Sequence, residues 1–372
     1  MKTVALVFGT RPEAIKLAPV ERLLRTAPGL ACRVCVTAQH REMLDQIIQA
    51  FDIEVDADLD IMRAGQELPE LTARLVVAID RWLRERSPDL VLVQGDTTTA
   101  FCAALAAFYR RIPVGHVEAG LRTGNLEAPW PEEANRTLIT RLARWHFAPT
   151  PRARENLLRE GVEDAAIEVT GNTAVDAIIA ACERVRACPP DVPGMPEDVI
   201  RGAQPLVLVT GHRRESFGSG LAGVCGAIAT LARRLPDVHF VYPVHLNPNV
   251  RDPVHRILPA ERLINVHVIS PLGYLPFVRM MIRATLILTD SGGIQEEAPT
   301  LGKPVLVTRQ VTERPEAIES GTAILVGTDP ARIILEVERL ISKPDARAAM
   351  MAAANPFGDG KAAQRIVDSI DR

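Results

Sequence analysis

The chain has 372 residues, which is enough for two domains that each bury a sizeable core. Hydrophobic residues make up 47% and charged residues 24% of it, and the net charge of -3 gives no reason to expect a nucleic-acid or membrane partner. The longest apolar run, at 100–109, is too short to span a bilayer, and Met1–Lys2 opens directly onto a strand-like stretch, so we expect a cytoplasmic protein without a signal peptide.

The first half of the chain alternates strand-like and helical patterns with short connections. An uninterrupted apolar run at 3–8 ends at Gly9 and predicts a buried parallel strand. Further strands are predicted in RVCVTA, DLVLVQ, PVGHVE and WHFAP, and helices at 13–25, 41–50, 67–86, 97–109, 132–143 and 151–160. This alternation predicts a doubly wound parallel α/β sheet.

Six cysteines are scattered along the chain, and only Cys32 and Cys35 lie close together. No second pair completes a zinc site, and two side chains at this spacing on a strand face opposite sides. We therefore expect reduced, packed thiols.

Residues 187–205 contain five prolines and predict a linker between domains at 1–186 and 206–355. Strand-like runs then resume at 206–211, 238–244, 264–269, 285–290 and 304–308. The expected fold is α/β, with two Rossmann-like doubly wound domains facing a central cleft. Ligands of such sheets bind beyond the carboxyl ends of the strands, and here both sets of strand ends would share that cleft.

The first loop, FGTRPEAIKLAP, lacks the G-x-G-x-x-G pattern of a dinucleotide site, because only Gly9 is present. Arg11 and Lys16 stand instead at the start of a helix, where backbone N–H groups favour anions. We predict an anion clamp there, for phosphate or for a network of carboxylates. The alternative is that Arg11 pairs with a nearby acid and Lys16 is solvated.

The second loop, VQGDTTTAF, places Asp96 just before a helix. Asp96 is a possible helix cap, but Thr97 to Thr99 already supply capping oxygens. We therefore predict that Asp96 faces the cleft as an acid/base group.

The third loop, GHVEAGLRTGNLEAPWPEEANR, gathers Glu118, Glu127, Glu132 and Glu133. Glu118 ends an apolar strand, where a charge needs a partner or a function. Glu132 and Glu133 open the next helix, and the alternative for them is simple complementation of its dipole.

Two further predictions concern residues close to these acids in the sequence. Arg122 and Arg136 are expected to hold the carboxylates ionised. His116 and Glu118 share one face of a strand and would form half of a metal site, but no further ligand cluster accompanies them.

The second half has its own polar loops. TGHRRESFGSG ends a strand with His212, Arg213 and Arg214, and TERPE adds Arg314 at a later strand end. In LTDSGGIQEEAPTLGKP, the stretch from Ser291 to Gly293 opens a helix whose N–H groups suit a diphosphate.

Glu296 and Glu297 follow in the first turns of the same helix, where one of them suits a ribose diol. The alternative for this segment is a glycine turn with acids at a helix N-terminus.

Together these strings resemble the bacterial non-hydrolysing UDP-N-acetylglucosamine 2-epimerases. The motifs GTRPEAIK, QGDTTT, GHVEAGLRTG, PEEANR, TGHRRES, YPVHLNPNV, DSGGIQEEAPTLGKPVL and TERPE occur in order from Gly9 to about Asp329, and the match extends into NPFGDGKAAQRIV. The resemblance implies the two-domain GT-B architecture, with a C-terminal helix at 356–372 crossing back to the first domain. It also implies interconversion of UDP-GlcNAc and UDP-ManNAc, a precursor of cell-surface polysaccharide, with neither NAD nor a metal ion, in a homodimer.

The resemblance assigns roles to individual residues. Asp96, Glu118 and Glu132 correspond to catalytic carboxylates, and His212 lies near the diphosphate and counts with them. The residues expected to bind substrate are Arg11, Lys16, Arg136, Arg214, Phe277, Ser291, Gly292, Gly293, Glu297 and Arg314, with Phe277 bordering the uracil and Glu297 the ribose.

Some relatives are regulated by a second UDP-GlcNAc held by two glutamines and an arginine. Gln39 matches this pattern, but Glu42 and Gly65 replace the other two residues. The resemblance therefore leaves that regulation open for this chain.

The expected reaction explains why so many carboxylates are needed. The C2–H of an N-acetyl sugar is not next to a carbonyl, but expelling UDP first acidifies it through oxocarbenium character at C1. Positive groups such as Arg11, His212 and the helix start at 291–293 would stabilise the departing diphosphate. Re-addition to 2-acetamidoglucal requires a proton on the opposite face, and hence more than one acid/base group.

Three alternatives remain open. A hydrolysing epimerase would share the fold and release free ManNAc. A GT-B glycosyltransferase would need one base and an acceptor surface, and a UDP-sugar sensor would not need the carboxylate motifs at all. The exact sugar is also open, because a 2,3-diacetamido uronate is compatible with these motifs.

Overall fold

The computed structural model describes residues 1–37, 41–61, 63, 65–211, 218–259 and 262–371. The chain divides into two compact units, Met1–Ala180 with Phe357–Arg372, and Ala181–Pro356. The division falls inside helix α7 (Thr173–Ala187) and not in the proline-rich segment 187–205. That segment is part of the second unit, because Arg279 donates hydrogen bonds to the Pro190 carbonyl and to Glu197 in the short helix α8 (Glu197–Arg201).

The first unit contains a seven-stranded parallel sheet in the order β3-β2-β1-β4-β5-β6-β7. Its strands are β1 (Lys2–Phe8), β2 (Leu30–Val36), β3 (Ala57–Asp58), β4 (Leu90–Gln94), β5 (Val114–Val117), β6 (Trp145–Ala148) and β7 (Ile167–Val169). The sequence did not predict β3 and β7, because two and three residues are too few for a periodic pattern. Cys32 and Cys35 on β2 are buried free thiols, as expected.

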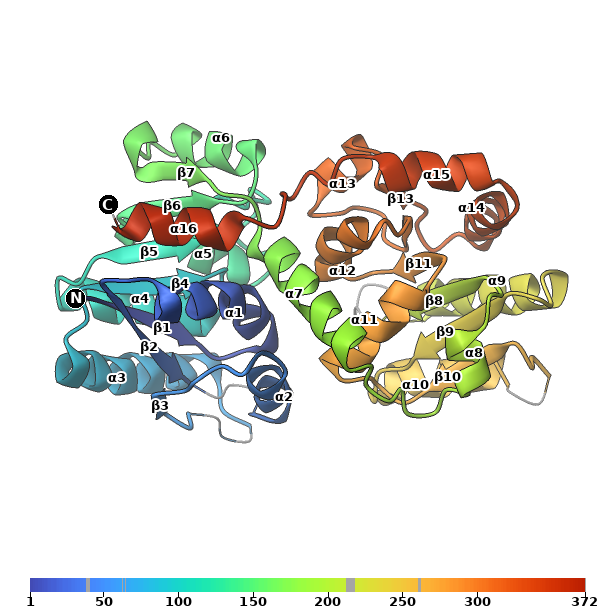
Figure 1. Ribbon diagram of the computed structural model, residues 1–372, viewed down its shortest axis with the longest axis horizontal. Coiled ribbons are helices and arrows are strands. Elements are labelled where there is room, and N and C mark those ends of the chain that lie inside the picture. Colours follow the sequence, from blue (N-terminus) through green and yellow to red (C-terminus); the bar gives the residue numbers. More distant parts are fainter. Residues whose placement is uncertain (38–40, 62, 64, 212–217, 260–261, 372) are drawn as a thin grey trace. The chain divides into compact units, whose positions relative to one another are not determined.

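Eight α-helices are described in or entering the first unit; the first six agree closely with the predicted ones, α7 was not predicted, and the last falls within the C-terminal helix that the resemblance implied. They are α1 (Arg11–Thr26), α2 (Arg41–Phe51), α3 (Leu68–Arg86), α4 (Thr98–Tyr109), α5 (Glu132–Leu142), α6 (Pro151–Arg159), α7 and α16 (Ala362–Asp371). The last of these, α16, packs against α1, far from it in sequence (Figure 1). Its first N–H groups, of Ala362 and Ala363, donate to the buried Asp176 carboxylate of α7, which fixes where the C-terminal helix begins.

The second unit contains a six-stranded parallel sheet in the order β10-β9-β8-β11-β12-β13. Its strands are β8 (Leu206–Thr210), β9 (His239–Pro243), β10 (Val266–Ile269), β11 (Leu286–Thr289), β12 (Val305–Val307) and β13 (Ala323–Leu325). Its helices besides α8 are α9 (Ser219–Arg234), α10 (Pro248–Ile257), α11 (Tyr274–Arg283), α12 (Gly292–Glu297), α13 (Pro315–Glu319), α14 (Pro330–Ser342) and α15 (Pro344–Ala352). Each unit has its own buried apolar core between sheet and helices.

The strand order reverses beside the first strand of each sheet, between β1 and β4 and between β8 and β11. Ligands of doubly wound sheets bind at the carboxyl ends of strands at such a reversal. In the first unit, Gly9 ends β1 there, and an added Cβ would lie 2.2 Å from the Thr37 hydroxyl and 2.6 Å from that of Thr99. Only glycine therefore allows the chain to leave β1 so close to its neighbours.

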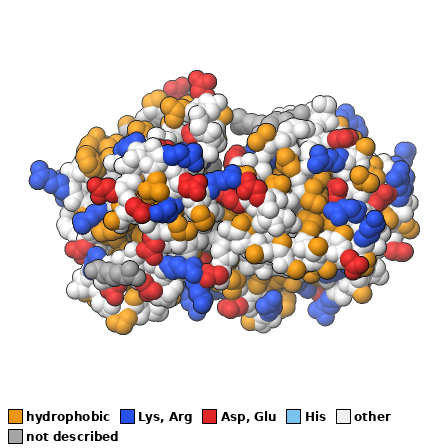
Figure 2. All heavy atoms as spheres, turned by 90° about the horizontal axis from the view of Figure 1, so that it is seen from above, with side chains coloured by type: hydrophobic (Ala, Val, Ile, Leu, Met, Phe, Trp, Pro, Cys, Tyr) orange, Lys and Arg blue, Asp and Glu red, His pale blue; other side chains and the backbone are white. Residues whose placement is uncertain are grey.

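Acidic and basic side chains are interspersed over the face shown in Figure 2, in keeping with the small net charge. Within the described residues, no helix has the length and apolar character that crossing a membrane would require.

Candidate active site

Glu118 directly follows β5 and is only 8% exposed. Its Oε1 lies 2.5 Å from Nζ of Lys16 in α1 and accepts a second hydrogen bond, of 3.2 Å, from Nδ2 of Asn172. Its Oε2 accepts a hydrogen bond from the side-chain amide of Gln94, the last residue of β4. An ammonium and two amides thus offset the cost of burying this carboxylate, which meets the expectation that a charge at this strand end needs partners.

The backbone at Glu118 is also unusual, with φ of 65°. This left-handed conformation is rare for residues other than glycine and costs on the order of 1 kcal/mol or more. The strain turns the chain sharply out of β5 and directs the carboxylate toward the end of β4.

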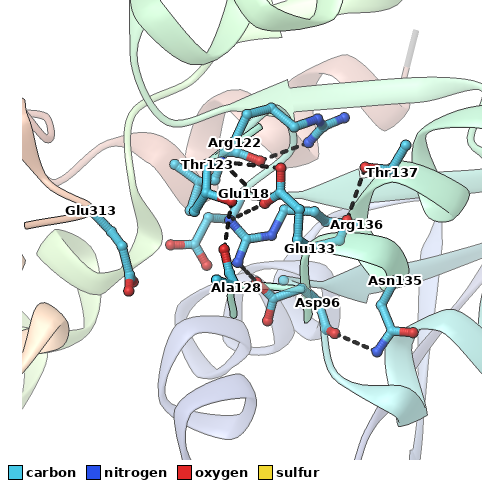
Figure 3. A network of polar contacts seen from close by, with 12 residues as sticks. Asp96, Glu118, Arg122, Thr123, Ala128, Glu133, Asn135, Arg136, Thr137 and Glu313 are labelled. Carbon is cyan, nitrogen blue, oxygen red and sulfur yellow. Dashed lines mark hydrogen bonds and ion pairs between the residues drawn. The ribbon is translucent and has the colours of Figure 1, made fainter. Parts of the chain in front are cut away.

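Asp96 lies at that neighbouring strand end and does not cap the following helix. Thr97 is the N-cap of α4, and its hydroxyl oxygen accepts the N–H of Ala100 at 3.0 Å. The capping alternative for Asp96 is therefore wrong, and its carboxylate instead lies 2.7 Å from the Arg136 guanidinium (Figure 3).

The surroundings of Asp96 favour its protonated form. Burial raises the pKa of Asp96 to about 6; Arg136 opposes the shift, and the negative charges of Glu118 and Glu132 add to it. The side chain keeps 26% of its surface exposed, so a proton can reach it. A carboxyl group that titrates close to neutral pH is suited to general acid/base chemistry.

The loop between β5 and α5 is held by Glu133, which is 2% exposed. Its Oε1 accepts the backbone N–H groups of Thr123 and Gly124, both at 3.0 Å (Figure 3). Glu133 therefore shapes the loop in addition to lying in the first turn of α5. Its neighbour Glu132 is half-buried, and Glu127 is exposed.

Arg122 does not serve these carboxylates, contrary to the expectation. Its guanidinium lies 2.6 Å from Glu160 at the end of α6 and donates to the Thr140 hydroxyl at 2.8 Å. Two planar groups in bidentate contact leave Arg122 committed to the Glu160 carboxylate, so of the two arginines only Arg136 contacts an acid of the predicted site.

His116 is fully buried, and its Nε2 lies 2.7 Å from the Gly95 carbonyl, to which it donates. Burial lowers the pKa of His116 to about 3, so the ring is neutral and ties β5 to the loop that carries Asp96. In the part of the chain that the structure describes, no three His, Cys, Asp or Glu side chains are grouped to hold a metal ion.

Glu13 connects the first two loops of the site. It is 1% exposed; Oε2 accepts the N–H groups of Gly9 and Thr10 at 3.0 and 2.8 Å, and Oε1 accepts the Thr97 hydroxyl at 2.7 Å. Burial raises the pKa of Glu13 to about 7, although these hydrogen bonds partly oppose the shift.

The anion clamp was predicted to hold either a phosphate or a network of carboxylates. In the structure, Lys16 binds the carboxylate of Glu118, as the second of these predictions expects. Arg11 is the first residue of α1, and its side chain is exposed. The two residues therefore do not bind one common group in this structure.

In the second unit, the segment from Ser291 to Gly293 begins α12, with Ser291 as N-cap. Glu297 is half-buried at its last turn, and Phe277 is half-buried in α11. Arg314 lies 2.5 Å from the Glu296 carboxylate, which is 1% exposed. Glu296 therefore pairs with Arg314.

Four predicted residues fall on parts of the chain without a full description. His212, Arg214 and Gln39 lie outside the described residues, as does the side chain of Glu42. Gly65 is described and has φ of 71°, in the left-handed region.

Three residues of the network were not predicted. Glu13 occupies the third position of α1 after Thr10, a spacing typical of a capping box that the sequence analysis did not use. Gln94 stood out only as a polar residue ending an apolar strand. Asn172 carried no signal, because it follows the short β7, which was itself missed.

The chain matches a known protein family. Residues 22–371 match the model of the family described as UDP-N-acetylglucosamine 2-epimerase. The chain is 55% identical over 369 residues to the UDP-N-acetylglucosamine 2-epimerase of Yersinia pestis, covering 99% of this chain and 98% of that protein.

Solved structures agree with the sequence relatives. The UDP-GlcNAc 2-epimerase from Neisseria meningitidis, solved bound to UDP-GlcNAc, has a TM-score of 0.89 at 47% identity and covers 99% of both chains. A putative UDP-N-acetylglucosamine 2-epimerase from Listeria monocytogenes has a TM-score of 0.91 at 45% identity, with coverage of 100% of this chain and 96% of that one. The chain belongs to the UDP-N-acetylglucosamine 2-epimerase family.

Proposed function

We propose that this protein interconverts UDP-GlcNAc and UDP-ManNAc by non-hydrolytic epimerisation at C2. The family membership supports the activity, and a relative from Neisseria meningitidis binds UDP-GlcNAc. The observation that carries the proposal is the pair of carboxylates at the ends of β4 and β5, whose surroundings differ.

Glu118 accepts hydrogen bonds from Lys16 and two amides, whereas burial and neighbouring charge raise the pKa of Asp96 to about 6. Two acids with such different environments are suited to take a proton on one side of a ring and give one on the other. A glycosyltransferase needs one base, so the pair favours epimerisation.

The reaction proceeds in two halves. The C1–O bond to UDP breaks with its electron pair leaving on the diphosphate, a carboxylate takes the C2 proton, and a C1–C2 double bond forms to give 2-acetamidoglucal. A second acid then delivers a proton to the opposite face of C2, and the diphosphate oxygen adds back to C1. Glu132 is the third candidate, because its charge already influences Asp96.

We assign the nucleotide to residues predicted from the family pattern. The start of α12 supplies N–H groups without intrahelical partners, which suit a diphosphate. Glu297 is assigned to the ribose from the same family pattern. The remaining residues proposed to contact substrate are Arg11, His212, Arg214, Phe277 and Arg314.

Several finer expectations remain predictions. They are a homodimer, a role in supplying polysaccharide precursors, and a second UDP-GlcNAc at Gln39 as an activator.

Incubation of the protein with UDP-GlcNAc in D2O, followed by proton NMR, tests the proposal directly. We expect UDP-ManNAc to form with solvent deuterium at C2. Free ManNAc without UDP-ManNAc would instead identify a hydrolysing enzyme. Product that retains its C2 proton completely would exclude proton exchange at this carbon and with it the mechanism.

A further inference from the structure

Asn172, immediately before α7, uses all its polar groups and is 3% exposed. Its Nδ2 donates to Glu118 Oε1 at 3.2 Å, and its Oδ1 accepts the N–H of Ala174 at 2.9 Å. Its own backbone N–H donates to the Phe357 carbonyl at 2.7 Å, where the C-terminal segment returns to the first unit.

These contacts allow only one orientation of the side-chain amide. A flipped amide would place Oδ1 against the Glu118 carboxylate and Nδ2 against the Ala174 N–H, so two favourable contacts would become two repulsive ones. The Phe357 carbonyl in turn holds the backbone from which the side chain projects. Asn172 therefore presents a fixed donor to Glu118.

Glu118 lies among several charges whose balance this donor affects. Lys16 faces it from α1, and Asp96 faces it from the loop after β4, where the charge of Glu118 acts on Asp96. Arg136 of α5 pairs with Asp96, and Glu132 of the same helix adds negative charge. With two carboxylates so close, a neutral donor at Asn172 gives Glu118 a further hydrogen bond without adding a charge.

We propose that Asn172 is a positioning residue for the epimerisation proposed above: it orients Glu118 by donating a hydrogen bond from an amide that the helix start and the C-terminal segment hold in place. This inference rests on the proposed function, because it assigns Glu118 a part in the reaction.

The decisive variant is Asn172→Asp. It keeps the shape of the side chain and an oxygen that caps Ala174, but it replaces the donor to Glu118 with a carboxylate oxygen. We expect kcat for UDP-GlcNAc to fall by about 10- to 100-fold, the range for a misplaced or wrongly charged acid/base group, while KM changes by less than about threefold. The limb of the pH–rate profile on the acid side should move to higher pH, because the variant adds a negative charge to this cluster of acids.

Asn156→Asp is the matched control. Asn156 also donates from its amide within the first unit, to the Gly120 carbonyl at 2.9 Å, and does not contact Glu118. We expect its kcat to stay within about threefold of wild type, with the acid limb unmoved. Wild-type kcat and pH profile in Asn172→Asp, or the same shift in both variants, would overturn the proposal.

A readout without turnover separates this inference from the proposed function. Thermal unfolding of Asn172→Asp should show a deficit in Tm relative to wild type that is larger near pH 8 than near pH 5, because two adjacent carboxylates repel when both are ionised and share a proton in acid. Asn156→Asp should show no such dependence. A pH-dependent deficit in Tm, found together with an inactive wild-type protein, would refute epimerisation and uphold the contact between Asn172 and Glu118. A deficit of the same size at both pH values would refute that contact.

Discussion

The two units share a strand order but differ in what stands at the strand ends. In the first, the ends of β4 and β5 carry Asp96 and Glu118, each beside a cation, and Asp96 keeps part of its surface open. In the second, Asp290 directly follows β11 and is 1% exposed, Ser291 and two glycines come next at the start of α12, and Glu296 is 1% exposed and lies 2.5 Å from Arg314. We therefore assign the proposed proton transfer to the first unit and the proposed nucleotide binding to the second, because function depends on the loops and not on the fold.

The comparison predicts that variants of the first unit lower kcat and that variants of the second raise KM. Glu118→Gln should have the largest effect, a loss of about 1,000-fold or more in kcat, because the variant removes an acid/base group and leaves Lys16 without its carboxylate. UDP binding, measured by calorimetry, should survive. Wild-type turnover in this variant would remove Glu118 from the reaction.

Arg314→Ala, in the second unit, should lower stability and substrate binding more than kcat. Breaking a largely buried ion pair costs about 3 kcal/mol of unfolding free energy, and we expect KM for UDP-GlcNAc to rise as well. Arg234→Ala removes a surface pair of the same unit, with Glu338, and should cost less than about 1 kcal/mol. Equal losses in denaturant unfolding of the two variants would show that the burial of Glu296 has no consequence.

Glu13→Gln, in the first unit, should change how the free energy of unfolding depends on pH. Because the pKa of Glu13 is raised from 4.5 to about 7, its contribution to stability is fully present below pH 4.5 and is lost as pH rises through 7. Glutamine has no such loss, so the free energy of unfolding of the variant relative to wild type should increase by about 3 kcal/mol between pH 4.5 and pH 7.5. A difference that is constant across this range would mean that Glu13 does not titrate in the folded protein.

The smallest expected effect is a change in slope of the pH–rate profile. With the pKa of Asp96 at about 6, the wild-type rate should show an inflection near that pH, of at most about tenfold per pH unit. The inflection should disappear in Asp96→Asn. Its persistence there would assign that titration to another group.

Part of the site could be predicted because local chemistry requires it. Glu118 at the end of an apolar strand, Thr97 as a helix cap beside Asp96, and Gly9 after β1 each follow from a few neighbouring residues. Arg122 was misjudged because its partner, Glu160, lies 38 residues away on another helix. The partner of Glu296, Arg314, likewise lies 18 residues beyond it.

The amino-acid sequence by itself determined the alternation of strands and helices, the two Rossmann-like halves and the family, because these depend on hydrophobic periodicity and on contiguous motifs. Only the tertiary structure decided which charges pair, that Asn172 and Gln94 hold Glu118, and that burial brings Asp96 and Glu13 close to neutral pKa values. Those properties arise from desolvation and from contacts between residues distant in the chain, and neither is encoded in any local pattern.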